Sequence, residues 1–236
     1  MAEFINTIDA LGDDAVIDGI IMRTITEFKD DAVIEIGKYA FNSCKNLADL
    51  LLPNVSLLRN YSFENCISLK NVDLPELLTV QWEGRAFKGC TSLETMRVPK
   101  ATYLEVEFVS GCSALREIYC PMLTSVRNNM FYGCSSLEVL DLPSLTEFLG
   151  IQPIGKCTKL KALVLRYTAK VCVLGSSSTM DNSTIKSGTG YVYVPSALVD
   201  SYKSATNWSA YASQIRALED YTVDGTITGE LDETKI

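Results

Sequence analysis

Six of the eight cysteines in this chain of 236 residues recur at nearly even intervals. The gaps between them are 22, 24, 22, 22 and 23 residues, and each cysteine is followed three residues later by leucine. The six are Cys44, Cys66, Cys90, Cys112, Cys134 and Cys157. A fixed period of this length is typical of structural repeats that pack only against their neighbours. The chain is therefore expected to fold as a solenoid.

Each repeat carries apolar residues at fixed distances from its cysteine. They stand three places before it and six, eight and fourteen places after it, as in Phe41, Leu50, Leu52 and Leu58. Positions six and eight place both side chains on one face of a short strand. A proline follows in five repeats and ends that strand, because proline has no N–H to donate. We expect these strands to stack in a parallel sheet, with short helical turns opposite.

The repeat motif A-F-x-x-C-x-x-L-x-x-[VIL]-x-[LV]-P resembles the BspA-type leucine-rich repeat family. It stands here from Ala40 to Pro53 and from Ala86 to Pro99. The resemblance covers about residues 33–174, with Arg166 in place of the proline in the sixth copy. It implies a bacterial cell-surface protein that binds host proteins or other cells, and no catalytic residues carry over. Similar arrays also resemble tail or surface components of phages and prophages.

The N-terminal residues depart from the repeat. Phe4, Ile8 and Leu11 have helical spacing, so residues 1–32 are predicted to form a helical cap over the first coil. The six-repeat array is predicted over residues 33–174, and Val33 and Ile36 match the last two columns of an incomplete preceding coil.

The C-terminal side is predicted to close the stack. Residues 175–220 contain a loop rich in small polar residues, then the strand-like Tyr191 to Pro195, then a helical segment with a break near Asn207. The apolar side of that segment holds Leu198, Tyr202, Trp208, Tyr211 and Ile215. Residues 221–236 are polar and acidic and are predicted to be a flexible tail.

Three interpretations fit the cysteine column. Reduced thiols could fill a narrow core like small apolar side chains, and this is the interpretation we favour. Disulfides between adjacent coils are the second, because strands about 4.8 Å apart meet the distance requirement. Metal binding is the third and is disfavoured, because the chain has no C-x-x-C motif and no histidine. No metal or cofactor is expected.

Composition argues against several classes of function. Without histidine the chain cannot use Ser-His-Asp or Cys-His catalysis. Carboxylate pairs could still hydrolyse a glycoside, but the strand-face candidates, Asp49, Asp73, Glu117 and Asp141, are interpreted as solvated surface charges. The net charge of −8 and the lack of a basic cluster disfavour nucleic acid and anionic membranes as partners. We therefore do not expect an enzyme.

The outward positions of the strands are the best candidates for a binding site. They lie five and seven places after each cysteine and become more apolar toward the C-terminal end, at Val139, Val164, Tyr191 and Tyr193. The predicted contact residues are Arg97, Tyr119, Asp141, Val164, Tyr191, Tyr193 and Trp82, which lies in a longer third coil. Two alternatives stay open: the C-terminal segment could fold over the apolar half, and Trp82 could pack over its adjacent turn.

The sequence thus predicts a non-catalytic binding or adhesion module that recognises a protein or a surface glycan. The sequence has no apolar run of about 18 residues, so it predicts no membrane-spanning helix. The family resemblance implies the cell surface or the extracellular space, yet the first residues lack the features of a secretory signal peptide. The alternative function is therefore a structural component of a phage or prophage virion.

Overall fold

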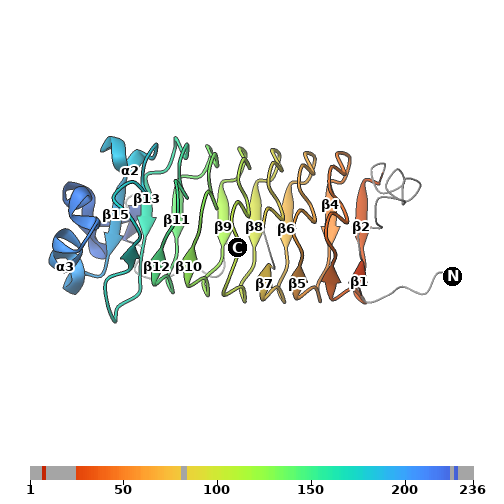
Figure 1. Ribbon diagram of the computed structural model, residues 1–236, viewed down its shortest axis with the longest axis horizontal. Helices are drawn as coiled ribbons and strands as arrows, with labels where there is room; N and C mark the ends of the chain where they lie inside the picture. Colours follow the sequence, from red (N-terminus) through yellow and green to blue (C-terminus); the bar gives the residue numbers. More distant parts are fainter. Residues whose placement is uncertain (1–6, 9–24, 81–83, 224–225, 228–236) are drawn as a thin grey trace.

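The computed structural model describes residues 7–8, 25–80, 84–223 and 226–227. The chain winds as successive coils along one long axis, and each coil adds strands to parallel sheets on two sides (Figure 1). The expected solenoid of six cysteine repeats is confirmed, because each coil of the array stacks on its sequence neighbour.

We call the sheet of three- and four-residue strands the front sheet. Its parallel strands pair as β2–β4, β6–β8–β9 and β11–β13–β15–β16, with β4 beside β6 and β9 beside β11. The strands are β2 (Glu27–Lys29), β4 (Asp49–Leu51), β6 (Asn71–Asp73), β8 (Thr95–Arg97), β9 (Glu117–Tyr119), β11 (Val139–Asp141), β13 (Ala162–Val164), β15 (Tyr191–Val194) and β16 (Ile215–Ala217). Thr95 pairs with Asn71 and with Glu117, so equivalent residues of the repeats form rows along the sheet.

The back sheet consists of strands of only two residues. They pair in parallel as β1–β3–β5–β7 and β10–β12–β14, and Tyr103 bridges to Thr79 between the two groups. The strands are β1 (Thr7–Ile8), β3 (Glu35–Ile36), β5 (Leu57–Leu58), β7 (Thr79–Val80), β10 (Ser125–Val126), β12 (Glu147–Phe148) and β14 (Val173–Leu174).

Single turns close the third side of each coil. In the first repeat the backbone N–H of Cys44 donates to the carbonyl of Phe41 at 3.1 Å, which is an i→i+3 bond. The coils are also bonded to one another here, since the N–H of Phe41 donates to Ser62 and that of Phe63 to Ala86. Hydrogen bonds between coils therefore form on all three sides, which accounts for the stability of such short strands.

Phenylalanine rings and thiols fill the core beneath these turns. The rings of Phe41, Phe63 and Phe87 stack in parallel with centroids 5.0 Å apart. All eight cysteines are buried and none forms a disulfide, so the expected column of reduced thiols is confirmed and the disulfide alternative is wrong. Five of the repeat thiols also donate to a carbonyl of the preceding coil, as Cys112 Sγ does to the carbonyl of Phe87 at 3.2 Å.

The stack begins earlier in the chain than the cysteine repeats indicate. Strand β2 pairs with β4, and Phe28 packs against Phe41 with ring centroids 4.9 Å apart. The predicted helical spacing is wrong at Ile8, which lies in β1 and pairs in parallel with β3. Phe4 and Leu11 lie outside the described residues. Val33 and Ile36 are buried, as predicted for a preceding coil.

The C-terminal segment continues the stack and then closes it. The predicted capping strand is β15, which pairs with β13. The helices of this segment are α2 (Thr184–Ser187), η1 (Ser196–Leu198), α3 (Val199–Ser204), η2 (Trp208–Gln214) and η3 (Leu218–Asp220). The predicted break near Asn207 is present as a residue with φ of 67° between α3 and η2.

Three side chains of this cap form hydrogen bonds with the backbone of β14 and of the residue before it. Tyr202 accepts a hydrogen bond from the N–H of Cys172 at 2.9 Å, and the indole of Trp208 donates to the carbonyl of Cys172 at 2.6 Å. Asn207 donates to the carbonyl of Leu174 at 2.7 Å. These bonds satisfy backbone groups that a further coil would otherwise pair, so the cap covers an edge that could template aggregation.

Part of the predicted flexible tail has regular structure. Strands β17 (Thr222–Val223) and β18 (Thr226–Ile227) pair as an antiparallel hairpin. Tyr221, directly before β17, is buried against the outer side of the front sheet. The predicted tail therefore includes a short hairpin, and its flexibility stays a prediction.

Candidate binding face

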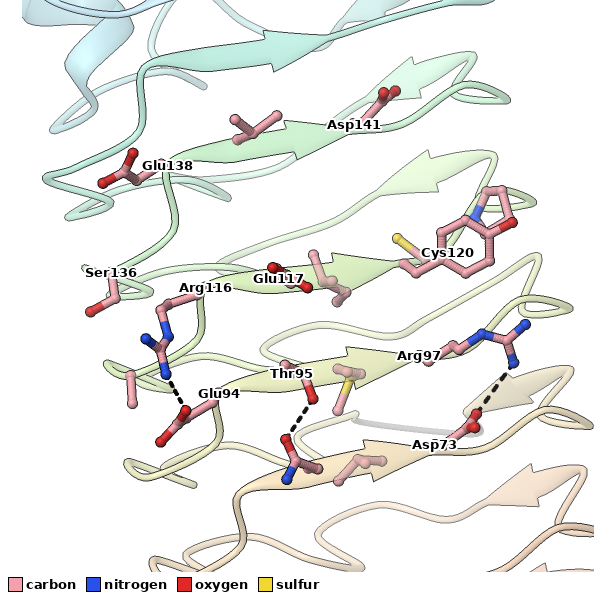
Figure 2. Close-up of a pocket in the computed structure, with 18 of the residues that line it drawn as sticks. Asp73, Glu94, Thr95, Arg97, Arg116, Glu117, Cys120, Ser136, Glu138 and Asp141 are labelled. Atoms are coloured by element: carbon pink, nitrogen blue, oxygen red, sulfur yellow. Dashed lines mark hydrogen bonds and ion pairs between the residues drawn. The ribbon is translucent and has the colours of Figure 1, made fainter. Parts of the chain in front are cut away.

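The outer side of the front sheet is hollowed into a groove of about 970 Å³. The groove lies over β6, β8, β9 and β11, and outward side chains of successive coils lie side by side in it (Figure 2). The predicted contact residues Arg97, Tyr119 and Asp141 all line it. Alternation along the strands explains this placement, because the residue between two outward positions points into the core.

Charges in the groove are matched from one coil to the next. Four of the carboxylates that line it each pair with a basic residue of the following coil. The pairs are Asp73–Arg97 at 3.5 Å, Glu94–Arg116, Glu138–Lys161 at 2.6 Å and Asp141–Arg166 at 2.8 Å. Most of these groups are well exposed, so each such pair contributes little to stability. They do hold the side chains of the groove in defined positions.

Aromatic and amide groups complete the centre of the groove. The guanidinium carbon of Arg97 lies 5.6 Å from the ring centroid of Tyr119. The hydroxyl of Thr95 donates to the side-chain oxygen of Asn71 at 2.7 Å. Both contacts join neighbouring coils, so the groove is formed in advance of any ligand.

A largely buried ion pair, Asp141–Arg166, forms the C-terminal end of the groove. The side chains of Asp141 and Arg166 are only 19% and 15% exposed. Burial raises the pKa of Asp141, and the hydrogen bond and charge of Arg166 oppose this rise. Tyr221 also lines this end, and burial raises its pKa to about 12. Asp141 is thus paired with Arg166 within the chain.

Part of the apolar half of the face, around Val164, is covered by the chain itself. Ala162 and Val164 are buried beneath Tyr221, with Leu218 and Tyr193 packed against the same cluster. The prediction of Val164 as a contact residue is therefore wrong, because Tyr221 fills the space above it. The alternative, in which the C-terminal segment folds over this half, is correct for Val164.

The remaining predicted contact residues lie outside the groove. Tyr191 and Tyr193 are half-buried on β15, and the guanidinium carbon of Arg216 lies 4.6 Å from the ring centroid of Tyr191. Burial also raises the pKa of Tyr193. Trp82 lies outside the described residues. The structure brings together Arg97, Tyr119 and Asp141 and leaves the two tyrosines of β15 as a separate group.

Several residues of the groove were not predicted as site residues, and Arg166 and Tyr221 at its C-terminal end are two of them. Arg166 stands where five repeats have proline, and this departure from the pattern was the available signal. Tyr221 lies beyond the repeats, and nothing in its local sequence indicates that it packs on the sheet.

Three of the four predicted carboxylate candidates, Asp73, Glu117 and Asp141, line the groove. Asp73 and Asp141 are paired with arginines, and Asp49 lies on β4 outside the groove. Within the described residues, no three side chains of His, Cys, Asp or Glu are grouped as metal ligands would be. The helices of that same part of the chain include none that is long and apolar enough to span a membrane.

Comparison with known proteins identifies the repeats. The BspA type leucine rich repeat region matches residues 34–161 in six copies, which is more than half of the chain. No curated protein sequence matches. A solved leucine-rich repeat protein from Bacteroides ovatus is 22% identical over 75% of this chain and 56% of its own, with a TM-score of 0.51, and it supports the fold.

A leucine-rich repeat protein of T. pallidum is 25% identical over 55% of this chain and 62% of its own, with a TM-score of 0.49. The chain therefore spans less than two thirds of the length of either structure. Six matched copies, stacked as the structure shows, place this chain in the BspA-type leucine-rich repeat family.

Proposed function

We propose that this chain is a non-catalytic binding module that recognises a protein or a surface glycan through the groove on its front sheet. The observation that carries the proposal is the groove itself, about 970 Å³ in volume and lined by side chains held in place by contacts between coils. Binding to a face that is already ordered avoids most of the entropy loss of fixing side chains. Leucine-rich repeat proteins generally serve as interaction modules, which agrees with this use.

Within the groove we propose Arg97 and Tyr119 as the main contact residues. Both are partly exposed, and tyrosine and arginine are the residue types that most often dominate binding energy. We include adhesion at a bacterial surface in the same proposal, and the frequent surface association of this family supports it.

The test is a screen of the purified chain on arrays of immobilised extracellular-matrix proteins and glycans. The Tyr119→Ala variant should lower the affinity for any binder by about tenfold or more. A matched control is Tyr39→Ala, because Tyr39 is 44% exposed but lies on the turn side. Loss of binding with the control variant, and none with Tyr119→Ala, would place the contact surface elsewhere.

The virion component remains a separate hypothesis with its own test. It predicts a stable oligomer in solution and genes for tail or capsid proteins beside this one. A monodisperse monomer from a locus without such genes would count against it.

A further inference from the structure

One carboxylate in the groove has no partner among the residues that the structure describes. Five acidic residues line the groove, and four of them are paired with a base of the following coil. Glu117, the first residue of β9, has no ion pair or hydrogen bond to any described residue. Figure 2 shows its side chain between the paired groups with no dashed contact.

The neighbours of Glu117 explain why it is unpaired. On β8 the residue opposite is Thr95, whose hydroxyl already donates to Asn71. On the other side, β9 lies beside β11, where the equivalent position is Val139. No basic side chain therefore occupies the place that Arg97 takes beside Asp73.

The surroundings of Glu117 suit one kind of side chain. Tyr119 lies two residues further along the same strand, so its ring is on the same face. Val139 is half-buried and presents apolar surface next to the carboxylate. A carboxylate, an aromatic ring and an aliphatic patch together match an arginine, which has a planar cation at the end of an apolar stem.

We propose that the groove receives an arginine side chain from a protein partner, with its guanidinium against Glu117 and its stem over Val139 and Tyr119. This inference rests on the proposed function and names the chemistry of the partner. Arginine is preferred to lysine because its fork can bond both carboxylate oxygens and its plane can stack on Tyr119. The chain's net charge of −8 would also speed the approach of a basic partner.

The experiment uses a displayed library of random peptides selected on the full chain. Peptides selected on the wild-type chain should be enriched in arginine, and selection on the Glu117→Gln variant should lose that enrichment. The control variant is Asp49→Asn, which removes the same charge from the same face but outside the groove. It should keep the enrichment.

A selected peptide is then synthesised and titrated by calorimetry. Its affinity should fall by about tenfold or more with Glu117→Gln, because a hydrogen bond to a charged group is lost. Replacing the arginine of the peptide with lysine should also weaken binding, whereas Asp49→Asn should not. Circular dichroism confirms that each variant is folded.

The inference and the proposed function fail in different ways. Peptides that need Tyr119 but ignore Glu117 and carry no arginine would refute the arginine inference and keep the groove as the contact face. Binding only to a glycan, lost with Glu117→Gln, would also refute it. If no binder of either class responds to any groove variant, the proposed function falls as well.

Discussion

Raising the pH above 9 should unfold this protein, because its core is built on thiols that cannot ionise in place. The ordinary pKa of a cysteine thiol is 9.0 here, and burial raises it to about 12 at Cys120, Cys157 and Cys172. Burial also raises the pKa of Cys90. It raises the pKa of Cys112 and of Cys134 well above the usual range of a thiol. At Cys66 the hydrogen bond to the Cys90 thiol raises the pKa, together with burial.

The sign of the effect follows from where protons are bound. A group whose pKa is higher in the folded state stabilises the fold fully below its unfolded pKa, and this contribution disappears as the pH rises toward the folded value. At pH 10 each of these thiols except Cys90 is about nine-tenths ionised in the unfolded chain and protonated in the folded one. These six thiols should therefore lower the free energy of unfolding by about 7 kcal/mol per pH unit near pH 10.

Between pH 9 and 10 the loss summed over these six thiols is about 6 kcal/mol, or about 1 kcal/mol for each thiol. That is comparable with the whole stability of an ordinary domain, about 5–15 kcal/mol. The chain should be stable at pH 8 and cooperatively unfolded within about two pH units above it.

The assay is urea unfolding followed by circular dichroism from pH 7 to 10.5, with a reducing agent that prevents disulfide formation. The matched variant is Cys120→Val, since other repeats have leucine or valine at that position. It should reduce the pH dependence by about one sixth, roughly 1.2 kcal/mol per pH unit near pH 10. A pH dependence below about 3 kcal/mol per unit would refute the reasoning, as would rapid labelling of the native thiols at pH 8.

Other perturbations test the cap, the groove end and the turns. Trp208→Ala should lower the free energy of unfolding by about 3–5 kcal/mol and promote aggregation, measured by urea unfolding and light scattering. Arg166→Ala should lower the free energy of unfolding by about 3–5 kcal/mol at pH 7, because Asp141 is left largely buried and without its partner. Part of this lost stability should be recovered at pH 4, because Asp141 then becomes protonated. Gly84→Ala should destabilise more than Gly111→Ala, although φ is positive at both, because the new Cβ would lie 2.1 Å from a backbone oxygen only at Gly84.

The fold of the repeats could be predicted because the residue types at equivalent positions of successive coils have a physical cause. Leu50 and Leu52 point inward since a strand alternates, and Pro53 ends that strand. The same alternation placed Arg97 and Tyr119 on the outer face. The thiol-to-carbonyl bonds of the cysteine column were not foreseen, because a sequence period shows that a side chain is inward but not which polar group it meets.

The ends and the covered half of the face could not be predicted from the period. The coil that contains β2 lacks the cysteine motif, and its place in the stack depends on strand pairing with β4. Tyr221 reaches Val164 from 57 positions along the chain, through a segment with no repeat to fix its path. Contacts of this kind are set by tertiary packing, which local pattern does not report.

Departures from the repeat are the most informative positions on this surface, because the fold constrains the two sides of each strand unequally. An inward residue must fill a column between two coils, so its identity is set by its neighbours. An outward residue is constrained only by the rows along the sheet, and here those rows pair acids with bases from coil to coil. Arg166 departs from the proline column and gains a buried partner in Asp141. Glu117 departs from the paired rows and has no ion-pair partner among the described residues. Contacts between the described coils therefore do not explain a carboxylate at that position. A partner's cation would supply that reason.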